Sequence, residues 1–437
     1  MMILRSICFV TAALLFASPV LAAKTWHVSK TTGKNKNDGS KEKPLKNIDK
    51  AVKKAKAGDT ILVAEGVYSG TFNIGYVEFK VPVKLYGGYT ADFSSRDPIA
   101  HPTVFQPDNK SGAKSRKALF QWKSGSKTQG VVIDGFVFDM GMRNAYSTKK
   151  GKPEGLETGM LLLPPAKEPG QKATVTEPCV SFRSGSKGGD ITISNNVFAN
   201  CASFGVQAAF RKGYVKVTNN VFVSNRMAAI EVFGTCPRPQ GKPKAQSKCG
   251  QVEYGNNTIL FTWSRLKDFL DMGYGTRMMT QAEYNVHHNI IGASILSGVD
   301  HSRFTPVEWI KLDNNVFFAN KQSALHFVPE SNTTLNLTPD QFDDLEYASV
   351  TGNKFEIPKT LILDKKYLAG FLAARYSEKA DYNPDSPANQ MRSLYGLNKQ
   401  GKLKTKVSMY ANRYPWKEAI KLFGAVTGVG AQKPAKK

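Results

Sequence analysis

Acidic residues are scarce in this chain, and their scarcity sets its charge. The 437 residues include 35 Asp and Glu but 60 Lys and Arg, which gives a net charge of +25 with neutral histidines. Long apolar runs are also missing, since no segment after residue 22 reaches the ~18 consecutive apolar residues that a membrane-spanning helix needs. A hydrophobic content of 41% is nevertheless too high for a disordered basic tail. The sequence therefore predicts a folded, basic protein without a transmembrane segment.

Residues 1–22 have the pattern of a secretory signal. Arg5 precedes an apolar run over residues 7–16, and small residues follow at Ser18–Ala22. Removal of this segment lowers the net charge to +24, and we expect the mature protein to be periplasmic or secreted and monomeric. Export argues against nucleic acid as the partner, so an acidic polysaccharide suits the charge better. A basic surface that serves only solubility is the alternative.

A six-residue phrase recurs along the chain. Its clearest copies, each ending in Asn-Asn-Val-Phe, span residues 193–198, 217–222 and 312–317, and the other copies are weaker. The second asparagine of each copy stands at position 196, 220, 257, 289, 315 or 353. Successive positions are 24, 37, 32, 26 and 38 residues apart, which indicates a unit near 24 residues with insertions. Apolar and polar residues alternate around each copy, so the unit is made of strands.

Strands that repeat in this way predict a parallel β-solenoid, in which each rung buries its inward side chains on the next. Asparagine tolerates a left-handed backbone, and its amide can hydrogen-bond to the equivalent residue one rung away. We therefore interpret the repeated asparagines as structural. His287 and His288 occupy the same turn in their copy and are interpreted in the same way.

Cysteine is scarce as well. Of five cysteines, Cys8 lies in the signal, and the other four are expected to form two disulfides in an oxidising compartment. A zinc site is disfavoured because no Cys-x-x-Cys pair is present. Four cysteines allow three connectivities. The repeat favours Cys179–Cys201, which are separated by about one rung, and Cys236–Cys249, which bracket an insertion.

Two parts of the sequence resemble one superfamily. The mature N-terminal region and the repeats are similar to right-handed parallel β-helix proteins of the pectate-lyase-like superfamily, and the resemblance covers roughly residues 25–356. It implies an all-β, right-handed parallel β-helix over residues 23–356. It implies no single function, because the superfamily includes lyases, hydrolases, epimerases, esterases and non-catalytic surface proteins. The matching N-terminal segments are Trp26–Ser29, Asn37–Ser40, Gly58–Ile61 and Gly66–Tyr68.

Both ends of the β-helix are expected to be capped. In the superfamily a short amphipathic helix closes the N-terminal end, and the apolar residues between Ile48 and Ala55 have the spacing for it. Residues 357–437 are expected to form a partly helical capping segment. Its amphipathic helices, at 364–377 and 415–425, are expected to cover the open last rung, and the tail after Gly428 is expected to be disordered.

The repeat register places one polar residue of each rung on the same outer face. This residue follows an apolar one that faces the core, so strand alternation directs it outward. In the rung with the largest insertion we count backwards from Asn289, because the forward count places Lys267 in the core. The resulting stripe, with one residue per rung and ~4.8 Å between rungs, consists of Gln207, Glu231, Arg277, Asp300 and His326.

Two chemistries can use this stripe. In the first, elimination or carbon-5 epimerisation of a uronate polymer, Arg277 neutralises the substrate carboxylate, His326 or a nearby lysine is the base, and Asp300 orients these groups. In the second, Glu231 and Asp300 are the acid and base of an inverting glycoside hydrolase. They lie two rungs or ~9.6 Å apart at the backbone, near the upper end of the ~6.5–9.5 Å carboxyl separation in such enzymes. The positive charge favours the first.

A binding protein without catalysis is the competing class, and a salt-bridge ladder is the structural alternative for the stripe. Insertions at 235–250, 262–284 and 332–347 are expected to wall a groove beside it. Besides Gln207, the side chains assigned to substrate binding are Trp263, Arg265 and Arg303, which can stack on sugars or pair with carboxylates.

Signatures that would name a subfamily are absent. The sequence contains no Asp-Pro-His-Asp, Gly-His-Gly or Gln-Asp-Thr-Leu. Val299-Asp300-His301 is only faintly similar to the Ile-Asp-His of pectate lyases, and the register points His301 inward, towards the core. No cofactor is required by the residues found. Calcium stays open, because Asp134, Asp139, Glu231 and Asp300 offer oxygen ligands although no metal-loop spacing is visible.

Overall fold

The computed structural model describes most of the chain after residue 21. The described residues are 22–71, 76–107, 118–140, 177–182, 188–234, 250–263, 272–328, 334–345, 348–375, 383–399 and 413–437. The expected signal, Arg265, Cys236 and Cys249 lie outside them. No helix in these ranges is long and apolar enough to cross a membrane.

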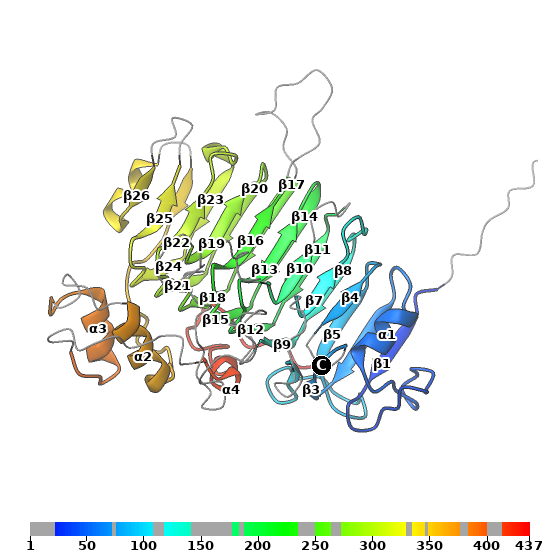
Figure 1. Cartoon of the computed structure of the whole chain (residues 1–437). Coiled ribbons are helices and arrows are strands. Elements are labelled where there is room, and N and C mark those ends of the chain that lie inside the picture. Colours follow the sequence, from blue (N-terminus) through cyan, green and yellow to red (C-terminus); the bar gives the residue numbers. More distant parts are fainter. Residues whose placement is uncertain are drawn as a thin grey trace, which may run out of the picture.

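Three sheets wind around a common core, and Figure 1 shows their strands stacked in rungs from β1 to β26. The ten-stranded sheet contains β1 (Thr25–Val28), β2 (Thr60–Ala64), β5 (Lys84–Tyr89), β8 (Val131–Asp134), β11 (Ile191–Ser194), β14 (Gly213–Thr218), β17 (Gly250–Gly255), β20 (Glu283–His287), β23 (Ile310–Asp313) and β27 (Ser349–Thr351). The eight-stranded sheet contains β3 (Gly66–Tyr68), β6 (Thr103–Phe105), β9 (Phe136–Asp139), β12 (Val197–Ala199), β15 (Val221–Val223), β18 (Thr258–Leu260), β21 (Ile290–Gly292) and β24 (Val316–Phe318). The nine-stranded sheet contains β4 (Val77–Phe79), β7 (Phe120–Trp122), β10 (Val180–Phe182), β13 (Phe204–Ala209), β16 (Ala228–Phe233), β19 (Tyr274–Met279), β22 (Ser297–His301), β25 (Ser323–Phe327) and β26 (Leu335–Leu337).

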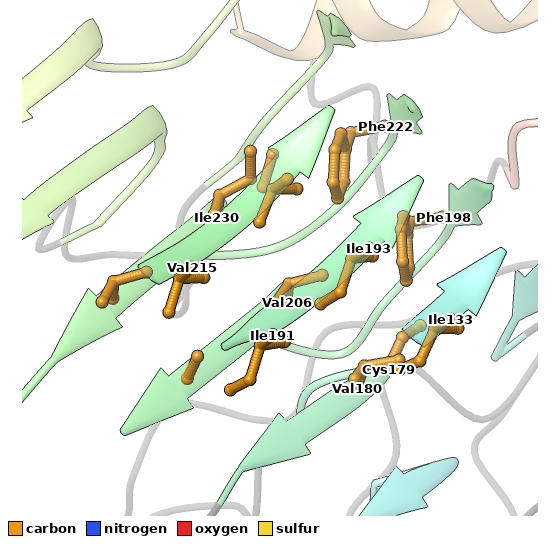
Figure 2. Close-up of a cluster of buried hydrophobic side chains, with 14 of the residues drawn as sticks. Ile133, Cys179, Val180, Ile191, Ile193, Phe198, Val206, Val215, Phe222 and Ile230 are labelled. Carbon is orange, nitrogen blue, oxygen red and sulfur yellow. The ribbon is translucent and has the colours of Figure 1, made fainter. Parts of the chain in front are cut away.

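The chain visits the three sheets in turn, so each rung contributes one strand to each. Among the described strands every pairing is parallel except that of β26 with β25. The expected right-handed parallel β-helix is confirmed. Its core is built from stacked like residues. Figure 2 shows Phe198 and Phe222 on neighbouring rungs, and their ring centroids lie 4.7 Å apart.

The repeated asparagines form a ladder at the turn between the ten-stranded and eight-stranded sheets. The first residue of each turn has a positive φ, 58° at Asn195 and 51° at His288. From Asn220 to Asn315 the second residue is buried, and its amide oxygen accepts two hydrogen bonds from the preceding rung. For example, the backbone N–H and the Nδ2 of Asn220 both donate to Oδ1 of Asn257, at 3.0 and 3.1 Å. The structural role expected for these residues, the histidine turn included, is confirmed.

The disulfide expected between Cys179 and Cys201 is present, 22 residues apart along the chain. The N-terminal cap is also as expected: helix α1 (Ile48–Lys54) buries Ile48, Ala51 and Val52.

The C-terminal segment is helical where expected but covers a different surface. Its helices are α2 (Lys365–Arg375), α3 (Pro387–Leu394) and α4 (Trp416–Ile420). Leu368 and Phe371 of α2 pack with Leu260 on the outer side of the eight-stranded sheet, and α4 contacts β12 and β15 of the same sheet (Figure 1). The expected surface was the last rung, and Pro387 and Gln390 of α3 do line a cavity there. Most of the segment, however, lies on the outer side of the eight-stranded sheet, which is apolar on both faces and requires a cover.

The core of the last rung is closed by residues of the insertion before β27. The 3-10 helix η4 (Pro339–Asp344) buries Phe342, whose ring centroid lies 5.6 Å from that of Phe317 in the core. A second short 3-10 helix, η3 (Val307–Trp309), precedes β23.

The tail after Gly428 is ordered, so the expectation of disorder is wrong. It runs along the outside of the asparagine turns. The backbone N–H of Gly430 donates to the carbonyl of His288 at 2.7 Å, and that of Gln432 donates to Oδ1 of Asn219 at 2.6 Å. Lys437 exchanges backbone hydrogen bonds with Arg96. The positive-φ turns expose amide and carbonyl groups that this segment satisfies, which its basic composition does not reveal.

Replacing an asparagine of the ladder should lower the stability of the fold by an amount that depends on its position in the ladder. Asn257→Ala removes the acceptor for two groups of Asn220, one of them a buried backbone N–H, and should lower the free energy of unfolding by about 3 kcal/mol. Asn353→Ala, at the half-buried end of the ladder, is the matched control and should cost less than half as much. Asn353 accepts the same two hydrogen bonds, from Asn315, but at a site that water can reach. Guanidinium denaturation of both variants measures the difference, and equal losses would show that burial does not set the cost of losing these bonds.

Candidate active site

The five residues of the stripe lie side by side on the outer face of the nine-stranded sheet. The strand register pairs Gln207 with Glu231, Glu231 with Arg277, Arg277 with Asp300, and Asp300 with His326. The residues before them face the core and are fully buried; these are Val206, Ile230, Thr276, Val299 and Leu325. The register counted from the asparagines therefore holds across four rung-to-rung steps, the backward count to Arg277 included.

An unbroken chain of hydrogen bonds joins the stripe. Gln207 donates from Nε2 to Oε1 of Glu231 at 2.8 Å. Arg277 donates from Nη1 to Oε2 of Glu231 and, at 2.6 Å, from Nε to Oδ2 of Asp300. Nδ1 of His326 lies 2.7 Å from Oδ1 of Asp300. Each side chain is thus held by its neighbour one rung away.

Arg277 is the charged centre of this chain. Its side chain is only 14% exposed, and those of Glu231 and Asp300 are 8% and 5% exposed. Burial alone would lower the pKa of Arg277, but the nearby carboxylates of Asp300 and Glu231 outweigh it, so the pKa of the guanidinium is raised. Two of its five N–H groups bind these carboxylates, and the other three have no partner among the described residues.

His326 has the geometry of an oriented base. Asp300 binds Nδ1, and Nε2 has no hydrogen-bond partner in the described part of the chain. The ring of Tyr274 lies 5.6 Å from that of His326, and the same distance separates it from Cζ of Arg277. A carboxylate on one imidazole nitrogen fixes the tautomer and leaves the other nitrogen to take a proton.

His301, the next residue after Asp300, points into the core as expected. It is 1% exposed, its Nε2 lies 2.7 Å from the carbonyl oxygen of Thr305, and its Nδ1 accepts from the backbone N–H of Val328 at 3.3 Å. Burial lowers the pKa of His301 more than its hydrogen bond to Thr305 and the charge of Asp300 raise it. It is therefore a neutral, satisfied core histidine.

The side chains assigned to substrate binding have different positions. Gln207 is part of the stripe. Trp263 is 1% exposed and donates from Nε1 to the carbonyl of Ser224 at 3.1 Å, so its assignment to sugar stacking is wrong. It follows β18 in the eight-stranded sheet and lies under the C-terminal segment. Arg303 is exposed after β22, with Cζ 5.3 Å from the ring of Phe304.

The structure adds two features that counting along the repeats did not reveal. An apolar cluster consists of Phe204, Ala228 and Tyr274, each three residues before a stripe residue on the same strand, and Met227, which directly precedes β16. Antiparallel β26 places the exposed Asn336 directly across from His326. The apolar cluster follows from the register, so counting along the repeats could have found it. The position of Asn336 could not be found in this way, because β26 belongs to an insertion outside the repeat.

A cavity of about 250 Å³ lies elsewhere, at the last rung. Phe317, Pro339 and Phe355 are among the residues that line it, and no residue of the stripe does. The chemistry-bearing side chains therefore lie outside this cavity.

The carboxylates that could have bound calcium are already engaged. Asp134 accepts hydrogen bonds from Arg96, Ser194 and Asn195, and Asp139 accepts from Gln106 and Asn200, while Glu231 and Asp300 bind Arg277. Within the described ranges, no three His, Cys, Asp or Glu side chains are grouped to hold a metal. In the described part of the chain these carboxylates are therefore not arranged as a calcium site.

Residues 31–276 match the family described as "Protein of unknown function (DUF1565)". The chain belongs to the DUF1565 family. No curated protein matches this DUF1565 chain.

Three solved structures are similar to this DUF1565 protein at low identity. They are XylC in complex with xylose (12% identity, TM-score 0.36, covering 76% of this chain and 68% of that one), pectate lyase Pel9A (12%, 0.34, 76% and 77%) and a rhamnogalacturonan lyase (9%, 0.32, 79% and 92%). At these scores the similarities carry no argument about the site.

Removing the guanidinium of Arg277 from between Glu231 and Asp300 should lower the stability of the fold strongly. Arg277→Met leaves two largely buried carboxylates facing each other without a cation, and should lower the free energy of unfolding by about 3–5 kcal/mol. The triple variant E231Q/R277M/D300N has no such charges and should recover most of this loss. Guanidinium denaturation of both measures it. A loss below about 1 kcal/mol for Arg277→Met would show that the cluster behaves as an exposed pair.

His301 predicts a loss of stability on the acid side. Because its folded pKa lies below the ordinary value of 6.5, the unfolded chain binds a proton more readily. The His301 contribution is therefore fully present above pH ~6.5 and is lost as the pH falls below it, at up to about 1.4 kcal/mol per pH unit. Unfolding measured between pH 7.5 and 5 should show a shallower slope for His301→Gln than for the unsubstituted protein. Equal slopes would contradict this.

Proposed function

We propose that the protein is exported and acts on an acidic polysaccharide, as a lyase or carbon-5 epimerase of a uronate polymer, with His326 as the base. The observation that carries this proposal is the Asp300–His326 pair on the outer face of the nine-stranded sheet, where the His326 side chain is 18% exposed and its Nε2 has no partner among the described residues. Abstraction of a proton next to a carboxylate requires such a base.

The residues of the stripe suit the steps of this reaction. Nε2 of His326 removes the carbon-5 proton, and Asp300 stabilises the resulting imidazolium. The remaining N–H groups of Arg277 bind the uronate carboxylate, on which negative charge builds up. In elimination this electron pair forms the carbon-4 to carbon-5 double bond while the glycosidic oxygen leaves carbon 4 and takes up a proton. In epimerisation a proton returns to carbon 5 from the opposite face.

The hydrolase alternative is less well supported. Hydrolysis requires one carboxyl group that holds a proton and donates it to the leaving oxygen. Here Glu231 and Asp300 both accept hydrogen bonds from the same guanidinium, an arrangement for two carboxylates. A polysaccharide-binding protein without catalysis stays the competing class.

Export is supported by two independent observations. Residues 1–22 have the charge, apolar run and small residues of a secretory signal. Cys179 and Cys201 form a disulfide, a bond that persists in oxidising compartments. We propose a periplasmic or secreted protein on these grounds.

The proposal predicts a product and a residue that makes it. The mature protein is incubated with alginate, pectate, glycosaminoglycans and neutral glucans, with and without calcium, and followed by proton NMR. Signals of unsaturated or inverted uronate should appear with an acidic polymer. His326→Gln should slow them by about 10²–10⁴-fold.

The matched control is His287→Gln. His287 also pairs with a carboxylate, Glu253 at 3.3 Å, but on the ten-stranded sheet, and its loss should leave the rate unchanged. If no polymer changes, or if His326→Gln retains full activity, the catalytic proposal is wrong. Binding of acidic polymers without turnover would assign the protein to the non-catalytic class.

A further inference from the structure

A row of exposed cations follows one corner of the β-helix, where the chain turns from the nine-stranded to the ten-stranded sheet. The cations belong to the turns before β2 and after β4, β7 and β13, which the helix stacks on one another. We name this row the basic corner; it consists of Lys56, Lys80, Lys123, Lys127, Arg211 and Lys212.

Backbone hydrogen bonds hold these turns in register. They run from Gly58 to Pro82 (2.9 Å), from Lys123 to Phe79 (2.9 Å), from Gly130 to Asp190 (2.9 Å) and from Arg211 to Gly188 (3.3 Å). Neighbouring rungs are ~4.8 Å apart, and the turns after β7 and β13 are two rungs apart because β10 lies between them. The cations therefore follow a line parallel to the axis of the solenoid.

The cations of the basic corner are not neutralised within the described chain. None of the six forms an ion pair there, whereas lysines on the ten-stranded sheet do: Lys216 pairs with Glu253 at 3.4 Å and Lys311 with Glu283 at 4.0 Å. Two carboxylates lie in the described turns of this corner, buried Asp59, whose charge interacts with that of Lys56, and half-buried Asp190, so the six cations exceed them by four.

A line of like charges repels itself, and a linear polyanion relieves that repulsion along its whole length. A charged membrane is planar and would meet only part of a convex corner. The row also leads to the stripe: β13 carries Gln207, the first member of the stripe, and ends two residues before Arg211. An extended chain on the corner can therefore continue onto the strand face that holds Glu231 and His326.

We propose that the basic corner binds an acidic polysaccharide along the axis of the β-helix and delivers it to the stripe. This inference rests on the proposed function for its choice of polymer, but binding at the corner does not require turnover at the stripe. The cations of the basic corner would then recognise the polymer without taking part in the proposed reaction at the stripe.

The test is the affinity of the full mature protein for polygalacturonate and alginate, measured by calorimetry at low and high salt. The variant K80E/K123E/R211E should bind at least about tenfold more weakly, equivalent to about 1.4 kcal/mol, and its affinity should depend less on salt. The matched control is K359E/K365E/K366E, which makes the same change of net charge at exposed lysines of the C-terminal segment. It should bind as the unsubstituted protein does, and thermal melts confirm that both variants fold.

The outcomes separate this inference from the proposed function. If His326→Gln binds normally without turnover while the corner variant loses binding, both stand. Binding that depends on the corner, with no turnover in any protein, supports the corner and overturns the catalytic proposal. Equal loss in both triple variants, no binding to either polymer, or binding only to anionic phospholipid vesicles overturns the corner as a polysaccharide site.

Discussion

The left-handed asparagine turn is the constraint on which the rest of the structure depends. Each turn places one residue at positive φ and buries the next, whose amide ties two rungs together, as in the Asn220–Asn257 pair. Because this turn fixes the register of the chain once in every rung, residues inserted elsewhere in the rung do not change the register of the strands that follow the turn. The 37-residue step from Asn220 to Asn257 preserves the same register as the 24-residue step before it.

The ionic stripe is a consequence of that register. A slip of one residue in any strand would turn its polar side chain into the core and bring an apolar one outward. Arg277 meets both Glu231 and Asp300 only because three successive rungs hold the same phase across two insertions. His326 is oriented by the same stacking, since Asp300 is its neighbour one rung away. The arrangement of side chains on this face therefore depends on backbone turns at a corner between the other two sheets.

The sequence predicts the features that the repeat determines, and it does not predict those that depend on contacts between distant segments. The repeat determines inward and outward positions, so the β-helix, the Cys179–Cys201 pairing and the five-residue stripe could be counted from it. The cover of the outer surface depends on contacts between segments far apart in the chain, which a local pattern does not encode. Trp263 looked like a groove residue for that reason, although it lies under the C-terminal helices, and the ordered tail along the asparagine turns has no repeat of its own.

The charges of the stripe and of the basic corner complement each other. With a neutral histidine, the stripe contains two carboxylates and one guanidinium, so by itself it repels a polyanion. The excess of positive charge lies elsewhere, and on the corner it is exposed and unpaired within the described chain. If an acidic polymer is bound by the corner, the stripe carboxylates do not repel its distant sugars. Only the sugar at the stripe lies next to Glu231 and Asp300. Under the proposed function, the remaining N–H groups of Arg277 would bind the carboxylate of that one sugar, so recognition of a uronate would be confined to the position beside His326.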